Sequence, residues 1–310
     1  MSPEQPNSKG ELRPESPQIG IRFVAMLGLT AVIFLLAAAH PASIRAAWAE
    51  IERIIQLKSA PLPASPARLS EHESEALDSM TPQKQAQLLL ERAINHYDGA
   101  IELIDLRVGG WYGQLKLDPE FNGLLDAAIN SNDLRVRAAS IEIYLAAYNL
   151  PKNSESALSL LDRIEQDPQW RPFGLWMLGA LANRGVEPER LQTALFDRLH
   201  DPDENTRRWT VEGIALLGTN ASIEPLLDTF HNDASPAVRE RAACGLAQSG
   251  MLTKEQRMTA VPEILKFTDD PALDHATQTW AFQALRDITG ASIGNDPAAW
   301  RAWLSGHSQN

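Results

Sequence analysis

The chain has 310 residues, of which 44% are hydrophobic and 22% charged, and its 40 acidic and 28 basic side chains give a net charge of −12. The apolar fraction is sufficient for a packed core, so the composition excludes a wholly disordered chain. The single cysteine, Cys244, excludes an internal disulfide framework and a cysteine-rich metal site. Residues 70–310 hold 35 acidic and 21 basic side chains, a balance that argues against general binding of nucleic acid.

The N-terminal part of the sequence contains one long hydrophobic stretch. Residues 1–18 are polar and proline-rich, and they predict a disordered tail. Residues 19–39 are apolar apart from Arg22, and they reach the length of about 20 residues that a membrane-spanning helix needs. We therefore expect a single transmembrane anchor over residues 19–39. A cleaved signal peptide is the alternative, because Ala37 and Ala39 resemble a small-residue cleavage site.

The orientation of this anchor follows less directly from the sequence. Three basic side chains precede or border the apolar stretch and three follow it, so the distribution of positive charge does not decide the orientation. Arg22 at the boundary favours an N-terminus on the inside. The C-terminal part would then lie on the outer, periplasmic side of a bacterial inner membrane. A cytoplasmic-facing domain and secretion after signal cleavage are the alternatives.

Two further segments separate the anchor from the rest of the chain. Residues 40–58 place Trp48 and several isoleucines at helical spacing among charged side chains, which predicts an amphipathic juxtamembrane helix. Residues 59–80 are rich in proline, serine and acidic side chains, a composition typical of a semi-rigid spacer.

From residue 81 onward the sequence predicts an all-α fold, because apolar side chains recur at intervals of three and four residues. Residues that favour the N-cap position stand directly before a proline at Thr81, Asp118, Asp167 and Ser235. Thr253 and Gln256 have the spacing of a capping box. Glycines that suit a helix end follow four of the apolar runs, at Gly185, Gly218, Gly250 and Gly290.

An internal repeat is the strongest signal of organisation in this region. Aspartates recur at intervals of 34, 34, 32 and 37 residues, at Asp133, Asp167, Asp201, Asp233 and Asp270. In two of these units an arginine follows the aspartate by six residues, at Arg207 and Arg239. Each unit predicts a helix, a turn that contains the aspartate, and a second helix. One such helix pair cannot bury its apolar face alone, so the pairs must stack.

These residues resemble HEAT repeats, an α-solenoid family with a proline in the first helix, an aspartate at the turn and Val-Arg at the start of the second helix. Pro225, Asp233, Val238 and Arg239 match this pattern in full, whereas the unit of Asp167 matches it least. The resemblance covers residues 118–290. It implies an α-α superhelix of about five helix pairs whose second helices line the concave face. It also implies a ladder between neighbouring repeats, formed by Asp201, Arg207, Asp233 and Arg239.

The segments on either side of the repeats are expected to act as caps that shield the terminal apolar layers. Residues 81–117 would form an N-terminal helical cap, with one long amphipathic helix over residues 81–107. Residues 291–310 would form a cap helix and a tail, in which Trp300 and Trp303 cover the last repeat.

No catalytic, cofactor or metal-binding motif stands out in the sequence. The histidines lack metal-ligand spacing, and neither a phosphate-binding loop nor a nucleophile elbow is present. The adjacent pair His72 and Glu73 is assigned to a solvated linker, since a second pair that could complete an iron site is missing. Cys244 lies among small apolar residues and is expected to be buried. We therefore expect no catalytic residue, metal or cofactor.

The remaining functional candidates are surface residues for a protein partner. Arg208, Trp209 and Arg241 are the candidate binding residues, because tryptophan and arginine are enriched at interface hot spots. Trp176 and Trp280 stand in apolar runs and are expected to pack in the core. The leading hypothesis is a membrane-anchored scaffold without enzymatic activity. The alternative is an enzyme resembling the HEAT-like lyases that handle chromophores, and a DNA-binding role is disfavoured by the negative charge.

Overall fold

The structure is a computed structural model, and it describes residues 67–307. The helices within this range are α3 (Glu71–Leu77), α4 (Pro82–Ile94), α5 (Ala100–Arg107), η1 (Val108–Gly110), α6 (Pro119–Ile129), α7 (Leu134–Ala147), α8 (Ser154–Gln166), α9 (Arg171–Asn183), α10 (Pro188–Phe196), η2 (Asp197–His200), α11 (Glu204–Leu217), η3 (Asn220–Ser222), α12 (Ile223–Asn232), α13 (Pro236–Ala247), α14 (Lys254–Phe267), α15 (His275–Thr289) and α16 (Pro297–His307). The described residues contain no strand, only an isolated bridge between Arg68 and Asp98. The predicted all-α fold is confirmed.

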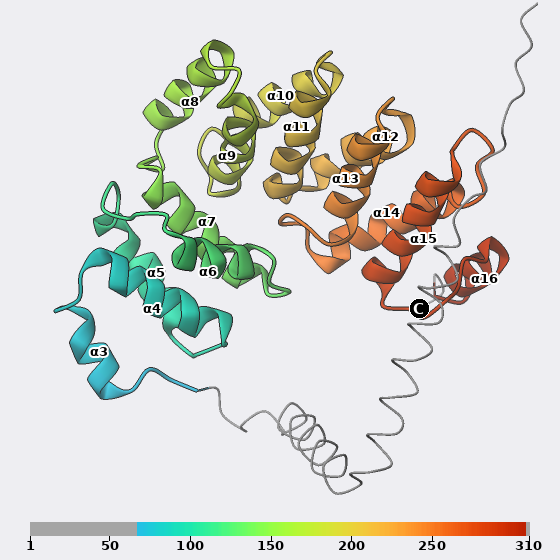
Figure 1. The fold of residues 1–310 in the computed structure, drawn as a ribbon. Coiled ribbons are helices and arrows are strands. Elements are labelled where there is room, and N and C mark those ends of the chain that lie inside the picture. Colours follow the sequence, from blue (N-terminus) through green and yellow to red (C-terminus); the bar gives the residue numbers. More distant parts are fainter. Residues whose placement is uncertain (1–66, 308–310) are drawn as a thin grey trace, which may run out of the picture. The chain divides into compact units, whose positions relative to one another are not determined.

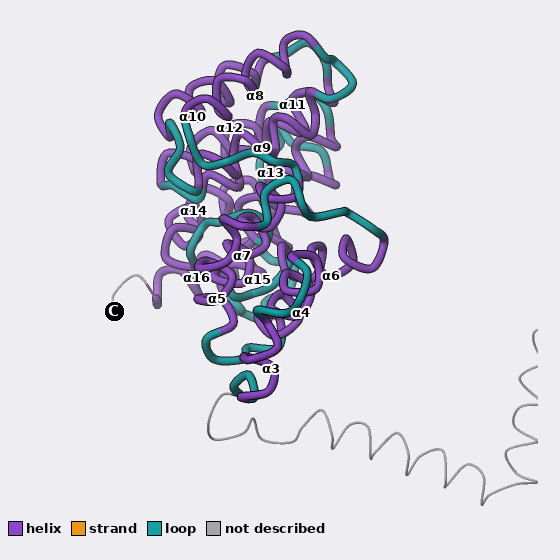
Figure 2. The backbone as a smooth tube through the Cα atoms, turned by 90° about the vertical axis from the view of Figure 1, so that its left-hand side faces the viewer, coloured by secondary structure: helices purple, strands orange, loops and turns teal. Residues whose placement is uncertain are grey.

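The helices between residues 118 and 290 form consecutive antiparallel pairs that stack along the chain. The pairs are α6–α7, α8–α9, α10–α11, α12–α13 and α14–α15, which gives five. The second helices α9, α11, α13 and α15 contact one another in sequence and make one layer, while α12 and α14 contact each other in the opposite layer. Figure 1 shows these pairs following one another along an arc, and Figure 2 shows the same helices from the side.

The apolar core runs along the stack in two clusters, because each helix pair is covered only by its neighbours. One cluster of buried side chains extends from Leu77 to Ala146, and a second extends from Ile141 to Trp300. Helix α7 contributes to both clusters, so it joins the N-terminal helices to the following repeats.

Several of the expected helix boundaries are present in the structure. The side chains of Thr81, Asp118 and Thr253 accept hydrogen bonds from the backbone of the first turn, and Thr253 and Gln256 form both halves of a capping box. The expected start at Asp167 is wrong. Helix α9 begins at Arg171, because the Asp167 carboxylate accepts from the backbone N–H of residues 169 and 170 within a separate turn.

The N-terminal segments differ from the expected arrangement in two places. The single helix expected over residues 81–107 is divided into α4 and α5, and the break includes His96 and Gly99 with φ of 58° and 84°. Residues 71–77 of the expected spacer form helix α3, whose Leu77 is buried. Glu73 is therefore not a free linker residue. It completes a capping box with Ser70 and accepts two hydrogen bonds from Arg92.

The expected tail (1–18), membrane anchor (19–39) and amphipathic helix (40–58) lie outside the described residues. Among the helices within residues 67–307, none has the length and apolar character required to cross a membrane. At the other end of the described range, Trp300 of α16 is 1% exposed, and its indole N–H donates to the carbonyl of Gly294. This side chain closes the C-terminal end of the core.

Candidate functional site

A row of large side chains occupies equivalent positions on four successive second helices. The N-caps of α9, α11, α13 and α15 are Trp170, Asp203, Ser235 and Asp274. The residue six positions after each N-cap belongs to this row, which comprises Trp176, Trp209, Arg241 and Trp280. All four are half-buried. Because the helices lie side by side in this order, the shared register places the four residues on one continuous surface, here called the second-helix row.

The sequence-predicted residues Arg208, Trp209 and Arg241 lie on two adjacent helices of this layer. Trp209 and Arg241 are equivalent members of the row, and Arg208 is exposed beside Trp209. Arg241 is not a free cation, because its Nε lies 2.7 Å from Glu212 Oε1. Burial raises the pKa of Glu212 despite the opposing influence of Arg241 and Arg208. The pair links α11 to α13, and the exposed Arg208, which forms no ion pair within residues 67–307, supplies positive charge nearby.

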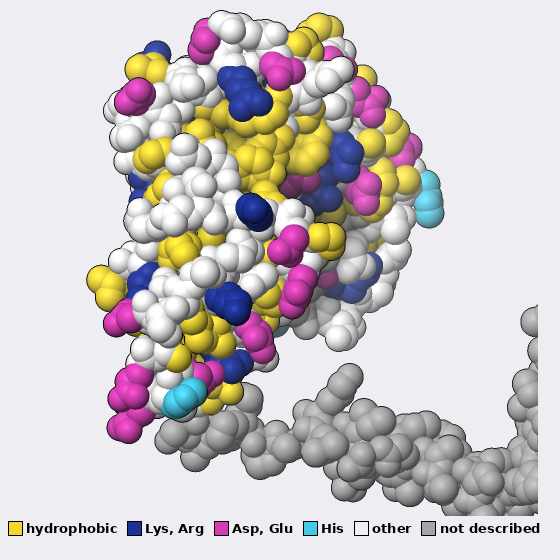
Figure 3. Space-filling model, turned by 60° about the vertical axis from the view of Figure 1, so that its left-hand side comes forward, with side chains coloured by type: hydrophobic (Ala, Val, Ile, Leu, Met, Phe, Trp, Pro, Cys, Tyr) yellow, Lys and Arg dark blue, Asp and Glu magenta, His cyan; other side chains and the backbone are white. Residues whose placement is uncertain are grey.

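The expectation that Trp176 and Trp280 belong to the core is wrong in part, since both keep exposed surface. Trp176 packs edge-to-face on Tyr144 of α7, with ring centroids 5.1 Å apart, and stacks near Phe173 at 6.2 Å. The ring centroid of Tyr148 lies 4.3 Å from that of Phe173, and Tyr148 is 39% exposed. Figure 3 shows hydrophobic side chains gathered in one area of the face that it turns forward, with Lys or Arg side chains at its border. Aromatic side chains therefore extend the row toward α7.

Beside Trp280 the row borders a small cleft between α13 and α15. Its volume is about 120 Å³, and Glu240 and Gln283 are among its lining residues. Cys244 also lines this cleft and is half-buried, so the prediction of a fully buried cysteine is wrong. Burial raises the pKa of the Cys244 thiol, which keeps it protonated and weakly nucleophilic at neutral pH.

Contacts between aspartates and arginines join the neighbouring repeats. Arg207 donates to both carboxylate oxygens of Asp233 at 2.8 and 3.0 Å. Arg239 donates to Asp274 at 2.6 Å, and not to Asp270, because Asp274 is the residue that caps α15. Asp270 accepts instead from His231. These contacts tie the turns before α13 and α15 to the second helix of the repeat before each of them.

Asp201 takes no part in such an ion pair. Its carboxylate accepts from the backbone N–H of Asp203, and Phe173 stands where the preceding repeat would need an arginine. At this interface α9 and α11 instead cross at Gly179 and Gly213, and a Cβ at residue 179 would meet the Gly213 carbonyl oxygen at 2.1 Å. A close backbone contact therefore replaces the ion pair between these repeats.

The described residues contain no group of three or more histidine, cysteine or acidic side chains that could hold a metal ion. A buried carboxylate, that of Glu142, is 1% exposed and accepts from Lys152 at 2.8 Å and from Arg184 at 2.7 Å. The nearby Tyr112 has its pKa raised to about 12 by burial and by the charge of Glu142. These contacts hold α7, the following loop and the end of α9 together.

Comparison with known families identifies the central repeats. Residues 155–247, which span α8 to α13, match the sequence profile described as HEAT repeats. This segment carries HEAT-type repeats. A search of curated proteins finds no match to the chain.

Several designed armadillo repeat proteins are among the solved structures that are similar to the chain. "Designed armadillo repeat protein YIII(Dq)4CqI" is 16% identical with a TM-score of 0.31, over 68% of this chain and 100% of that one. "Designed armadillo repeat protein YIII(Dq.V1)4CPAF in complex with peptide (KR)4" is 15% identical with a TM-score of 0.32, over 67% and 99%. At these TM-scores the likeness says nothing about the curvature of the present repeats or about their ligands.

Proposed function

We propose that the chain is a membrane-tethered, non-enzymatic scaffold whose HEAT-type repeats bind a segment of a protein partner on the second-helix row. The observation that carries this proposal is the register of Trp176, Trp209, Arg241 and Trp280, which repeats on four consecutive helices. Three half-buried tryptophans at one helical position pack against the core and keep part of their surface exposed. Apolar side chains that gather at the surface in this way are typical of binding surfaces. Tryptophan and arginine are also the side chains that dominate binding energy at interfaces.

The spacing of the row favours a partner segment in an extended conformation. Axes of packed helices are about 8–10 Å apart, and an extended chain advances about 3.3 Å for each residue. A segment that crosses the helices would therefore meet successive members of the row about every three residues. Apolar or aromatic anchors would fit beside the tryptophans, and an acidic side chain would fit beside Arg208.

The tether rests on the sequence of residues 19–39, and its test is separate from that of the binding surface. After cell fractionation and a carbonate wash, the full chain should stay in the membrane pellet, whereas a chain without residues 19–39 should be released. Protease treatment of spheroplasts should cleave near residues 59–66 if the repeats lie on the periplasmic side. Release of the full chain by carbonate would contradict the anchor and leave the binding surface untouched.

Site-specific photo-crosslinking tests the second-helix row. A photoreactive amino acid at residue 209 should give a discrete crosslinked product in cells, and the same substitution at Leu158 should not, because Leu158 is 43% exposed but lies on α8 in the other layer. Replacing Trp176 and Trp280 by alanine should weaken the product from residue 209. Equal crosslinking at residues 209 and 158 would refute the proposed surface.

A peptide screen supplies a second and independent measurement. The purified chain should enrich peptides whose aromatic or apolar residues recur about every three positions. A variant with Trp209→Ala and Arg208→Ala should lose this enrichment, with some loss of thermal stability because Trp209 also packs against the core. Arg208→Ala alone should weaken the enrichment without a change in thermal unfolding, because this side chain is exposed. Enrichment that survives in the double variant would place the binding surface elsewhere.

A further inference from the structure

Two distant turns of the repeat array meet and enclose a pocket. The turn between α6 and α7 contacts the turn between α13 and α14, where Arg137 Nη1 donates to the Gly250 carbonyl at 2.5 Å, although the two residues are 113 positions apart. The pocket beside this contact has a volume of about 820 Å³, which lies within the range of small-molecule sites. It is separate from the aromatic part of the second-helix row and shares only Arg241 with it.

The pocket contains two buried guanidinium groups without a carboxylate partner. Arg137 is 6% exposed and Arg257 is 7% exposed. Arg137 donates to the backbone carbonyls of residues 131 and 250, and Arg257 donates to those of residues 246, 248, 249 and 252. Neither arginine belongs to any ion pair within the described part of the chain.

Burying like charges without a counter-ion is unfavourable, and proteins normally pair such charges or place an anion beside them. Burial lowers the pKa of Arg257 to about 10, and the positive charge of Arg137 adds to this effect. Both groups are therefore charged at neutral pH, and their charge is solvated by backbone carbonyls but not neutralised by a carboxylate within the described residues.

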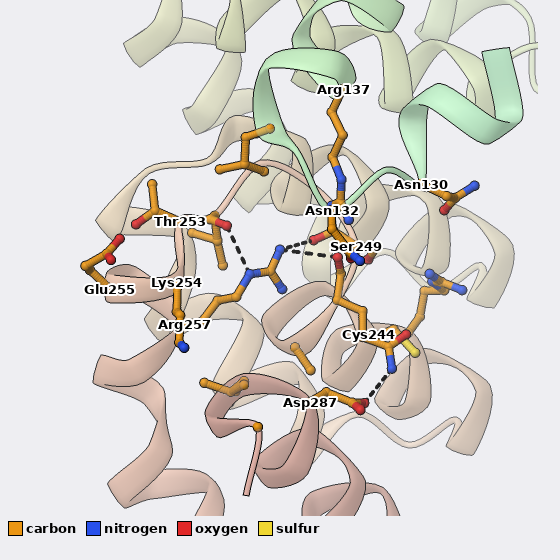
Figure 4. A pocket seen from close by; sticks show the side chains of 17 residues that line it. Asn130, Asn132, Arg137, Cys244, Ser249, Thr253, Lys254, Glu255, Arg257 and Asp287 are labelled. Carbon is orange, nitrogen blue, oxygen red and sulfur yellow. Dashed lines mark hydrogen bonds between the residues drawn. The ribbon is translucent and has the colours of Figure 1, made fainter. Parts of the chain in front are cut away.

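Several hydrogen-bond donors that line the pocket remain unused. The Nη2 group of Arg137 and the side-chain amide of Asn132 have no partner among the described residues, and Ser249 Oγ is buried without a hydrogen bond. Lys254 is exposed at the edge of the pocket and takes part in no ion pair within residues 67–307. Figure 4 shows Arg137 and Arg257 entering from opposite sides, with Asn132 and Ser249 between them.

The acidic side chains of the pocket do not neutralise the two arginines. Asp287 accepts hydrogen bonds from the side-chain amides of Gln248 and Gln283. Glu255 is exposed, and the positive charge of Arg241 is paired with Glu212 on α11. The centre of the pocket therefore offers donors and positive charge to a ligand.

We propose that this pocket binds a small phosphorylated molecule, with its phosphate oxygens held by Arg137, Asn132 and Ser249 and assisted by the charges of Arg257 and Lys254. Guanidinium groups form short, charge-assisted hydrogen bonds to phosphate oxygens. The pocket is larger than one phosphate requires, so the ligand carries an organic part or a second phosphate. By binding where two remote turns meet, the ligand would also link the turn before α7 to the turn before α14.

This proposal can be tested by calorimetry and by thermal unfolding of the full chain in mild detergent. The probes are pyrophosphate and fructose 1,6-bisphosphate, and sodium chloride at matched ionic strength is the control. Both probes should bind with measurable heat and raise Tm in a saturable manner. Arg137→Met should abolish binding, and Lys254→Ala should weaken it roughly tenfold, in line with the loss of one charged contact. Lys84→Ala, which removes an exposed lysine of α4, should leave binding unchanged.

A second variant guards against a failure of Arg137→Met to fold. Asn132 is exposed at the turn, so Asn132→Asp should fold normally and its added negative charge should repel the ligand. The matched control Asn205→Asp, at the exposed start of α11, should fold normally and leave binding unchanged. An absence of binding to the wild-type chain would overturn the proposal, as would a Tm increase that sodium chloride reproduces or that Asn132→Asp leaves intact. In those cases Arg137 and Arg257 would serve only to hold the backbone turns.

Discussion

Glycine-to-alanine substitutions at Gly179, where α9 and α11 cross, and at Gly123 in α6 should have opposite effects on stability. Gly179 lies in α9 where a Cβ would stand 2.1 Å from the carbonyl oxygen and 2.8 Å from the Cα of Gly213. Ordinary contact begins near 3.4 Å, so the two helices would have to separate by about 1.3 Å to admit one methyl group. Gly123 in α6 has no atom within 4 Å of the corresponding position, so an added methyl group would meet open space.

The expected free energies follow from these two environments. Alanine is favoured over glycine in a helix by about 0.5–1 kcal/mol, and Gly123→Ala should stabilise the fold by that amount. The same gain applies to Gly179→Ala, but overpacking costs about 1–3 kcal/mol and sometimes more. The clash here is with rigid backbone, which places the cost at the upper end of that range. We expect Gly179→Ala to destabilise the protein by about 2 kcal/mol net.

Urea unfolding followed by circular dichroism and tryptophan fluorescence measures both changes. Gly179→Ala should lower the unfolding midpoint and Gly123→Ala should raise it, with unchanged dependence on urea concentration. Because repeat arrays can unfold in parts, the two signals should be compared for coincidence. A Gly179→Ala variant as stable as the wild type would show that α9 and α11 do not approach as closely as the structure describes.

Three further predictions concern charged groups. Glu142→Ala should destabilise the fold by about 2–4 kcal/mol, measured by urea unfolding, since it removes the buried partner of both Lys152 and Arg184. Hydrogen bonds from Thr277 and the charge of Arg239 lower the pKa of Asp274 to about 2. The ionised Asp274 should therefore stabilise the fold above pH 3.8, and this stabilisation should be lost as the pH falls toward 2. Asp274→Asn should remove this part of the pH dependence of the unfolding free energy. Burial lowers the pKa of His231, but hydrogen bonds to Asn232 and Asp270 outweigh this effect and raise it above 6.5. The protonated His231 should therefore stabilise the fold below pH 6.5, and this stabilisation should disappear as the pH rises through the raised pKa. In an NMR titration, Asp270→Asn should lower the pKa of His231.

The fold was predictable because its signals are local. Helix periodicity and caps such as Asp118 and Thr253 depend on residues within one turn of each other, and the structure contains these caps. The repeat spacing was equally clear where successive units have the same length. The spacing gave a wrong prediction at Asp270, because extra residues precede α15. Asp274 therefore caps α15 in place of Asp270, and Asp274 also accepts the hydrogen bond from Arg239.

The candidate site was only partly predictable. Trp209 and Arg241 were found by aligning two units that match without a gap, but Trp176 and Trp280 were assigned to the core because their neighbours are apolar. The row follows from the N-caps of the structure, because the residues six positions after the expected turn residues Asp167 and Asp270 are Phe173 and Ala276. The pocket was beyond such reasoning, since the contact between Arg137 and Gly250 depends on how the whole array curves.

The interfaces between the repeats differ in kind, and this difference determines where the array should open first. The interface between α11 and α13 is held by the ion pairs of Arg207 with Asp233 and of Arg241 with Glu212, while the interface between α9 and α11 depends on the contact at Gly179. In a stacked array each interface contributes its own free energy, and the weakest one sets the size of the unit that opens. Both ion pairs are partly buried, so salt screens them less than it screens exposed pairs, but it leaves a backbone contact almost unchanged. High salt should therefore loosen the repeats after α11 before those around α9, and a ligand that links the turn before α7 to the turn before α14 would oppose this opening.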